Sequence, residues 1–222
     1  MNPVSKWTAF FAMSFIASLT SSATTPAVRR VAFVFDDGPV VEQTQQMLAV
    51  LAHANVHVTF SYVGKNVIEH PELARAAAEA GHDIANHSFT HPHLKTLSEE
   101  VILKELTDTN AAISKATGRT LQWFWAPFLE MDDRVESAAH SAHLTPFPYQ
   151  HFHFVSTEDW NVAATDAAMI RQRATTDIRD NTVVLCHEWR PETLAQLPAI
   201  LEQLKSEGVV FLTFTEMAAL DR

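Results

Sequence analysis

The 222-residue sequence has a single cysteine, no surplus of positive charge and no long apolar run beyond its first residues. A lone Cys186 excludes an intramolecular disulfide and a zinc cluster built from cysteines. The formal net charge of -10 argues against a surface that neutralises nucleic-acid phosphates, so we expect no nucleic-acid partner. We attribute the negative charge to a solvated surface and infer no other partner from it. After residue 23, no apolar stretch approaches the length of a membrane span.

The N-terminus is typical of a secretory signal peptide. Lys6 supplies a positive n-region, residues 7–19 are mostly apolar, and Ser21-Ser22-Ala23 offers a small-residue cleavage site. The apolar stretch is too short for a comfortable membrane span. We therefore expect residues 1–23 to be a signal peptide and the protein to be secreted or periplasmic. An uncleaved membrane tether is the alternative.

From Arg30 onward, short apolar runs alternate with amphipathic stretches. This pattern predicts strands followed by helices, and hence parallel strands wrapped by helices. The predicted strands are residues 31–35, 56–62, 82–86, 121–125, 152–156, 182–186 and 209–214. The predicted helices are residues 43–53, 71–80, 98–117, 132–143, 165–180 and 191–206, with a short helix at the end. About seven such units fit one closed or nearly closed α/β barrel better than two domains.

Unusual polar residues gather where the predicted strands end. Asp36-Asp37-Gly38-Pro39 ends the first strand, His87 to His91 follow the third, and His187 ends the run that begins at Thr182. Trp125 to Phe128 and Asp159-Trp160 follow two further strands. In an α/β barrel the carboxyl ends of the strands share one face, where active sites lie. The sequence therefore predicts that five separate segments meet at one site.

Asp37, His87 and His91 form the candidate metal site. Two histidines four residues apart can lie on one face of a helical turn and share a cation. Alone this spacing is weak evidence, because the chain has 12 histidines and two surface or capping histidines would fit it equally. A carboxylate from a separate strand end favours a metal, since three protein ligands leave positions open for water and substrate.

Asp36 and His187 are the candidate base and acid. Asp36 could take a proton from water, although Asp-Asp-Gly-Pro could also be a plain turn. Against the turn, two adjacent carboxylates beside a buried strand cost desolvation. His187 emerges from an apolar strand and could protonate a leaving group, with Asp159 fixing its tautomer. A core histidine bonded to the backbone is the alternative for His187 alone.

Several other residues receive structural interpretations. Cys186 lies in an apolar run and is expected to be a small buried hydrophobe. Trp123 and Trp125 alternate around Phe124, so one of them could face the barrel mouth and stack on a sugar ring, with core packing as the alternative. Glu130 could contact substrate or open a helix. Four histidines with irregular spacing fit exposed loops better than a second metal site: His140, His143, His151 and His153.

Five segments resemble, in order, the motifs of the polysaccharide deacetylase family, also called the NodB-homology domain or carbohydrate esterase family 4. They are residues 35–39, 87–91, 126–128, 159–160 and 185–187. The first two are specific together, and the others are short. The resemblance covers roughly residues 30–215. It implies a distorted (β/α) barrel and a metal-dependent hydrolase that removes N-acetyl or O-acetyl groups from a carbohydrate polymer, such as a GlcNAc-containing glycan.

The resemblance also implies a role for each matched catalytic residue. Asp36 is the base, and His187, supported by Asp159, is the acid. The cation is Zn²⁺, or Co²⁺ or a similar ion, and its ligands are Asp37, His87 and His91. Lewis-acid polarisation of the acyl oxygen together with activated water is the physical basis of that chemistry.

Substrate contacts are implied in the same way, with one departure. The backbone N–H of Phe128 would help hold the oxyanion, and Trp160 with Leu185 would line a pocket for the acetyl methyl group. The family usually has an arginine, which orients and charge-pairs the base, where this chain has Trp125. We expect Trp125 to do neither, so Asp36 should be more basic and the pH optimum higher than in relatives.

Two other functions stay open. The first is a glycan-binding pseudo-enzyme that lost turnover with its arginine. The second is a related metal amidase or esterase with a small substrate. Retention of a base, an acid and three ligands favours an enzyme, because binding alone needs neither base nor acid.

Overall fold

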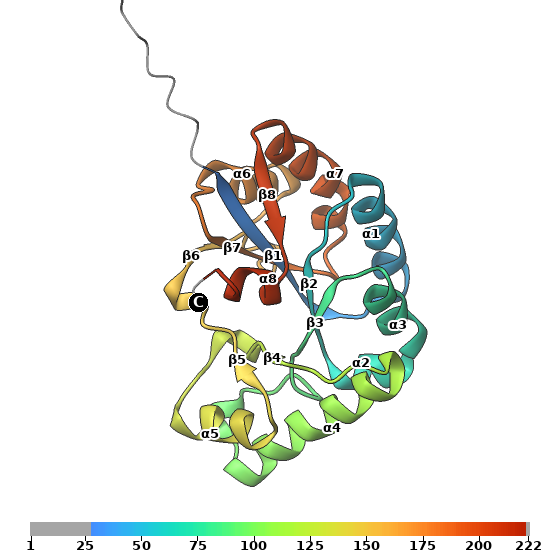
Figure 1. Cartoon of the computed structure of the whole chain (residues 1–222), viewed down its shortest axis with the longest axis vertical. Coiled ribbons are helices and arrows are strands. Elements are labelled where there is room, and N and C mark those ends of the chain that lie inside the picture. The colour runs from blue at the N-terminus through green and yellow to red at the C-terminus, as the bar shows by residue number, and fades with distance from the viewer. Residues whose placement is uncertain (1–27, 221–222) are drawn as a thin grey trace, which may run out of the picture.

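The computed structural model describes residues 28–220 and has an α/β fold built on one curved, parallel sheet (Figure 1). The predicted signal segment, residues 1–23, lies outside the described residues. The strands are β1 (Arg29–Gly38), β2 (Thr59–Tyr62), β3 (Asp83–Asn86), β4 (Trp123–Phe124), β5 (Thr145–Pro146), β6 (His153–Ser156), β7 (Thr182–His187) and β8 (Val209–Leu212).

The strand order is β5-β4-β3-β2-β1-β7-β6, with β8 paired to β1 off this path. One edge of β1 is shared, because Arg29–Ala32 pairs with β8 and Val34–Gly38 pairs with β2. The path ends at β5 and β6, so the barrel is open between them. The prediction of a distorted (β/α) barrel is confirmed. All seven predicted strands are present, and β5 was not predicted because two residues show no periodicity.

The helices follow the strands, and all but the last, α8, lie on the outer side of the sheet (Figure 1). They are α1 (Val41–Ala54), α2 (Gly64–Glu69), α3 (Pro71–Glu79), α4 (Glu99–Thr117), α5 (Asp133–Ser141), α6 (Ala167–Thr176), α7 (Pro191–Ser206) and α8 (Phe214–Ala218). The Ser98 side chain caps α4 and Gly118 ends it with a φ of 72°, as their residue types predict. The six-residue α2 was not predicted. None of the helices in the described part has the length and hydropathy to cross a membrane.

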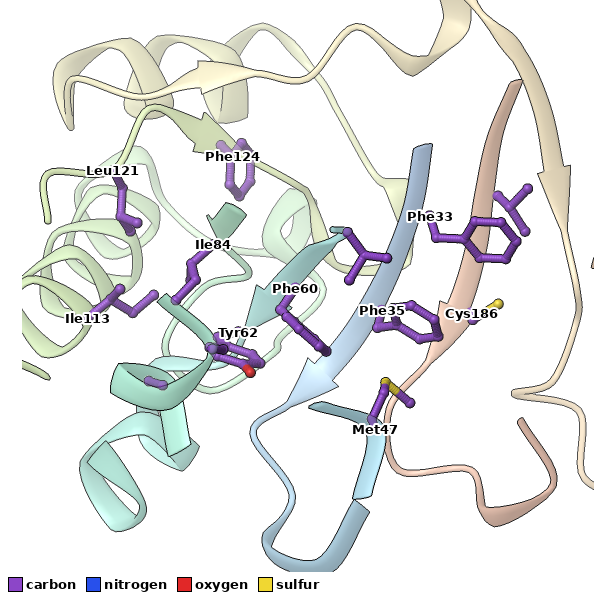
Figure 2. Packing of buried hydrophobic residues seen from close by; sticks show 14 of the residues in the cluster. Phe33, Phe35, Met47, Phe60, Tyr62, Ile84, Ile113, Leu121, Phe124 and Cys186 are labelled. Atoms are coloured by element: carbon purple, nitrogen blue, oxygen red, sulfur yellow. The ribbon is translucent and has the colours of Figure 1, made fainter. Parts of the chain in front are cut away.

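Side chains alternate between the two faces of the sheet, as a strand period of two requires. On β1, Val31, Phe33 and Phe35 join the cluster under the outer helices, which also contains Phe60 and Cys186 (Figure 2). Cys186 is 1% exposed, as predicted for a small buried hydrophobe, and burial raises the pKa of its thiol. The even-numbered side chains of β1, Asp36 included, point the other way, toward the barrel interior.

A second cluster fills that interior. It contains Ala32 and Val34 of β1 together with Trp123, Trp125 and aromatic residues of the C-terminal half. Helix α8 lies within the curve of the sheet, where Phe214 stacks on Phe147 with ring centroids 3.7 Å apart. Both tryptophans are buried, so core packing is the place that the structure gives them.

Candidate functional site

A pocket of about 390 Å³ lies at the carboxyl ends of the strands. All five motif segments reach it or support it, as the sequence predicts. The β1–β7 register places Asp36 directly opposite His187, so the candidate base and acid come from neighbouring strands. The lining residues are Asp36, Asp37, His87, His91, Phe128, Leu129, Ser156, Trp160, Leu185, His187 and Trp189.

The three predicted metal ligands meet in this pocket. Asp37 Oδ1 lies 3.2 Å from His91 Nε2 and 3.5 Å from His87 Nε2. One ligand atom from each residue lies within 4.8 Å of the other two. Within residues 28–220, this is the only group of histidine, cysteine or acidic side chains placed closely enough to surround one ion.

The surroundings of these residues fit a divalent cation. His87 Nδ1 lies 2.7 Å from the carbonyl oxygen of Trp125, so this nitrogen carries the proton and leaves Nε2 as a ligand. Asp37 Oδ1 is buried and accepts no hydrogen bond from the described residues, which is costly without a positive partner. One carboxylate and two imidazoles are a donor set of catalytic zinc sites, which keep a position open.

The backbone at the site adopts conformations that side-chain-bearing residues rarely take. Such left-handed positions cost about 1–2 kcal/mol each for residues other than glycine. Hydrogen bonds hold these loops, since Asn66 Nδ2 donates to the carbonyl oxygen of Asp37 at 2.9 Å and His91 N donates to Ser88 Oγ at 3.1 Å. The positive φ values at the pocket are those of Asp37 (70°), Ser88 (62°), His91 (58°), Phe128 (57°) and Leu129 (55°).

Histidine charges and burial act in opposite directions on the two adjacent carboxylates. Burial raises the pKa of Asp36 to about 6, against the lowering effect of His87 and His187. Burial also acts to raise the pKa of Asp37, but contact with His87 and the charge of His91 outweigh it and hold that pKa well below its usual range. Asp36 is therefore the more basic of the pair, which suits a proton acceptor.

The structure decides between the two alternatives for Trp125 and corrects one expectation about it. Its ring is 1% exposed and packs in the interior cluster, so it does not line the pocket or offer a face to a sugar. Its indole Nε1 donates a hydrogen bond to Asp36 Oδ2 at 2.9 Å. The expectation that Trp125 cannot orient the base is therefore wrong, because an indole N–H reaches the carboxylate. As a neutral donor it supplies no charge pair, as expected.

His187 and Asp159 form a buried pair beside the pocket. His187 Nδ1 lies 2.7 Å from Asp159 Oδ1, and the His187 backbone N–H donates to Asp159 Oδ2 at 2.8 Å. Thr193 Oγ1 donates to the same Oδ2 atom at 2.6 Å. Burial disfavours the charged imidazole, but the Asp159 hydrogen bond and the nearby carboxylates outweigh it and raise the pKa of His187 to about 9. The ring is thus a proton donor near neutral pH.

The pocket walls are largely apolar. Phe128 and Trp160 are 51% and 55% exposed at the mouth, and Leu185 lies deeper at the end of β7. The Phe128 ring stacks on His93 with centroids 3.9 Å apart, and His93 pairs with Glu130 at 3.3 Å. Glu130 therefore lies near the mouth rather than in the first turn of α5, whose N-cap is Asp132.

Sequence reasoning missed Trp189. Its indole Nε1 donates to Asp37 Oδ2 at 3.0 Å, so it holds the carboxylate of a candidate metal ligand. The available signal was its position two residues after His187, in the turn that leaves β7. Ser156, at the carboxyl end of β6, also lines the pocket and had been given no role.

The other histidine group has ordinary ion pairs. His140 lies 3.7 Å from Glu136 on the same helix, and His153 lies 3.0 Å from Asp177. Both contacts are at the surface, but His140 lies in helix α5 and His153 in strand β6, so the prediction of exposed loops is wrong for these two residues. They form no second group of metal-ligand geometry among residues 28–220.

Comparison with known proteins agrees with this geometry. A sequence model described as polysaccharide deacetylase matches residues 23–147. A peptidoglycan-N-acetylglucosamine deacetylase of Listeria monocytogenes is 30% identical over 205 residues, which are 90% of this chain and 42% of that protein. The chain thus spans about two fifths of the length of that relative.

Two further proteins are matched over most of their length. A chitooligosaccharide deacetylase of Rhizobium leguminosarum bv. trifolii is 31% identical over 194 residues, covering 81% of this chain and 87% of the relative. The structure of a family 4 carbohydrate esterase from Streptomyces lividans in complex with acetate superposes with a TM-score of 0.75 at 32% identity. It covers 82% of this chain and 91% of that chain.

Proposed function

Because this chain belongs to the polysaccharide deacetylase family, we propose that it removes acetyl groups from an acetylated carbohydrate polymer. The substrate we favour is a GlcNAc-containing glycan cleaved at its N-acetyl amide, with O-acetyl esters as the alternative. The names of the Listeria and Rhizobium relatives support this substrate class. The observation that carries the proposal is the meeting of Asp37, His87 and His91 within 4.8 Å, beside Asp36 and His187 in one pocket.

Asp37, His87 and His91 would hold a divalent cation, and Zn²⁺ suits one carboxylate and two imidazoles better than an ion that prefers oxygen alone. Co²⁺ or a similar ion is the alternative. When bound, the cation supplies Lewis acidity that stabilises charge on the acyl oxygen and makes water easier to deprotonate. His87 is held for this task by its Nδ1 contact to the Trp125 carbonyl oxygen.

Asp36 would act as the base. Its pKa of about 6 keeps it ionised near neutral pH and makes it more basic than an ordinary aspartate. Its carboxylate is oriented by the Trp125 N–H and lies across from His187 in the β1–β7 register. Asp36 would thus take the proton of the attacking water on one side of the pocket.

His187 would act as the acid. It carries a proton near neutral pH, and Asp159 fixes the ring by its contact to Nδ1, so Nε2 is the atom that donates. This proton would go to the leaving nitrogen as its bond to the acyl carbon breaks. Asp159 is therefore a supporting residue that sets the orientation and charge of the ring.

Apolar residues and one backbone group would bind the acetyl end of the substrate. Trp160 and Leu185 would contact the methyl group, and the Phe128 N–H would donate to the oxyanion. The exposed Phe128 and Trp160 rings give the mouth apolar faces on which sugar rings can pack.

We also propose that the protein is exported. The support is the composition of residues 1–23, which has a positive n-region, a short apolar stretch and a small-residue cleavage site. N-terminal sequencing of protein recovered outside the cytoplasm would test this, with an uncleaved tether as the opposite outcome.

Acetate release from acetylated chito-oligosaccharides and from peptidoglycan fragments tests the proposed activity. We expect release by the purified protein, loss on treatment with a chelator, and recovery on adding Zn²⁺. Asp37→Ala should abolish release, and Asp180→Ala, at the far edge of the sheet, should leave it unchanged. Binding of the oligosaccharides without release would favour a pseudo-enzyme. Release only from small amides or esters would favour a small-substrate hydrolase.

A further inference from the structure

The adjacent carboxylates of Asp36 and Asp37 each accept a hydrogen bond from a different tryptophan side chain. We propose that Trp125 and Trp189 are positioning residues, each of which holds the Oδ2 atom of one carboxylate and leaves its Oδ1 atom for the reaction. The inference rests on the proposed function, because it assumes that Asp36 is the base and Asp37 a metal ligand. It explains how two adjacent aspartates can act differently, Asp36 as the base and Asp37 as a metal ligand.

The hydrogen bonds are symmetrical in form. Trp125 Nε1 donates to Asp36 Oδ2 at 2.9 Å, and Trp189 Nε1 donates to Asp37 Oδ2 at 3.0 Å. The Oδ1 atoms of both carboxylates are buried and accept no hydrogen bond from the described residues. Each carboxylate thus has one oxygen held by an indole and one oxygen that accepts no hydrogen bond within residues 28–220.

The orientation of each carboxylate has to be fixed because both carboxylates are close to the same imidazole. His87 Nε2 lies 3.5 Å from Asp37 Oδ1 and 3.7 Å from Asp36 Oδ2. Without a fixed orientation, Asp36 could turn toward the cation and become a further ligand instead of a base. The Trp125 N–H occupies the Asp36 oxygen that lies nearest His87 and so opposes that rotation.

The Trp125 ring cannot easily rotate away. It is 1% exposed and its centroid lies 5.3 Å from those of Tyr149 and Phe214 and 6.3 Å from that of Phe147. Close packing on several sides fixes the ring and therefore the direction of its N–H. The interior aromatic cluster thus packs the core and also fixes the Trp125 N–H at the carboxyl edge of the sheet.

The backbone beside Trp189, in the turn after β7, is anchored through Glu188. The Glu188 N–H donates to the Asp36 carbonyl oxygen at 2.9 Å, which ties this turn to β1. The buried Glu188 carboxyl accepts from the Val40 N–H at 3.3 Å and from the Thr44 hydroxyl group. These contacts anchor the backbone next to Trp189 and the backbone next to Asp37, the two partners of the indole–carboxylate hydrogen bond.

The two indoles should affect different measurements. Trp189 supports a metal ligand, so loss of its N–H should weaken metal binding. Outer partners of metal ligands contribute about 10–100-fold in affinity or activity. Trp125 supports the base, so loss of its N–H should lower kcat without weakening metal binding, and KM should stay the same.

The experiment replaces single tryptophans by β-(3-benzothienyl)alanine, which has sulfur in place of the N–H and nearly the same shape. Trp123 is the matched control, because its buried indole donates to Thr215 Oγ1 at 3.0 Å, away from the pocket. Zn²⁺ dissociation constants are measured by competition with a chromophoric chelator. Acetate release at saturating Zn²⁺ gives kcat and KM, and circular dichroism checks that each variant is folded.

We expect the substitution at Trp189 to raise the Zn²⁺ Kd about 10–100-fold and to change kcat at saturating metal by less than about 3-fold. At Trp125 we expect kcat to fall about 10-fold or more, with KM unchanged and a Zn²⁺ Kd no higher than that of the wild type. At Trp123 no constant should change. Wild-type values for Kd at position 189 and for kcat at position 125 would overturn the proposal.

The same experiment separates this proposal from the proposed function. A wild-type protein that binds Zn²⁺ and releases no acetate contradicts the deacetylase activity, and the Kd at position 189 then decides the inference alone. An active wild type whose constants are insensitive to both N–H groups contradicts the inference alone.

Discussion

The two edges of the sheet use left-handed backbone in different ways. At the amino edge, each connection from a helix to the next strand contains one residue with positive φ, and these residues are Asn55, Gly81, Gly118, His143, Asn181 and Gly208. At the carboxyl edge, the positive-φ residues are Asp37, Ser88, His91, Phe128, Leu129 and Glu158. Glycine and asparagine take this conformation readily, whereas phenylalanine and leucine do not.

The two edges also differ in the burial and pairing of their charged side chains. At the amino edge, Arg29 pairs with Glu207 at 2.9 Å and Arg30 pairs with Asp180, both at the surface. At the carboxyl edge, Asp36 and Asp37 are largely buried, and one oxygen of each has no hydrogen-bond partner in the described residues. The amino edge pairs these charges at the surface, whereas the carboxyl edge keeps buried charge and left-handed backbone at non-glycine residues around the proposed site.

The largest effect that would test this comparison is loss of activity without loss of stability. Asp36→Asn keeps the shape of the side chain and an oxygen for the Trp125 N–H, but it cannot accept the proton from water. We expect kcat to fall about 10²–10⁴-fold. The free energy of unfolding should stay the same or rise, because burial disfavours the Asp36 charge. Acetate release and urea unfolding measure the two effects.

The matched change at the amino edge is Asp180→Asn, which removes the charge that pairs with Arg30. It should leave kcat unchanged. An Asp36→Asn variant that keeps kcat within about 10-fold of wild type would contradict the role of the base.

The second effect is a change of pH dependence on Asp159→Asn. The Asp159 hydrogen bond and charge, together with the charges of Asp36 and Asp37, raise the pKa of His187 to about 9 against the effect of burial, so loss of the Asp159 charge should lower this pKa toward its ordinary value of 6.5. His187 acts as an acid only while protonated, and activity therefore falls above its pKa. We expect the basic limb of the pH–rate profile to move down by about one unit or more.

Stability gives an independent check of the same pair. The His187 pKa is raised in the folded protein, so its protonation stabilises the fold fully below about pH 6.5 and ceases to do so as pH rises through about 9. The wild-type unfolding free energy should therefore decline across this window more steeply than that of Asp159→Asn. Parallel curves would show that the pair is not coupled as described.

A third change makes the carboxyl edge more like the amino edge. Trp125→Arg would place a cation beside Asp36 and lower its pKa from about 6. Because Asp36 acts only when ionised, the acidic limb of the pH–rate profile should move down by about one unit. The guanidinium would lie among Tyr149 and Phe214, so Tm should fall as well. Identical pH–rate profiles would remove the idea that the missing cation sets the pH optimum.

Much of the fold could be predicted because its signals are local. The strands are apolar runs rich in valine and phenylalanine, and α4 is bounded by Ser98 and Gly118, whose caps the structure contains. The two-residue β5 and the six-residue α2 were missed, since neither is long enough to show a period. Helix α6 ends at Thr176, four residues before its predicted end, because sequence periodicity fixes helix ends poorly.

The site could be predicted only as far as residue type and strand position allow. Asp37, His87 and His91 follow from motifs at strand ends, which the barrel brings together. The contributions of Trp125 and Trp189 depend on which way an indole N–H points, and that direction is set by packing between distant segments. Reasoning from charge alone predicts that Trp125, in place of arginine, cannot orient Asp36, although the Trp125 indole donates a hydrogen bond to that carboxylate.

The smallest effect concerns backbone strain itself. Phe128 has a φ of 57° and a half-exposed ring, so Phe128→Asn removes little buried surface and places a residue that tolerates this conformation. The unfolding free energy should be unchanged or rise by up to about 1 kcal/mol. Loss of a ring that packs on a sugar should raise KM about 3–10-fold. Asn55→Ala, at the amino edge, should do the opposite, lowering stability by about 1 kcal/mol with no kinetic change. If Phe128→Asn proved the more destabilising of the two, packing on His93 would outweigh strain, and the difference between the edges would be one of sequence rather than of energy.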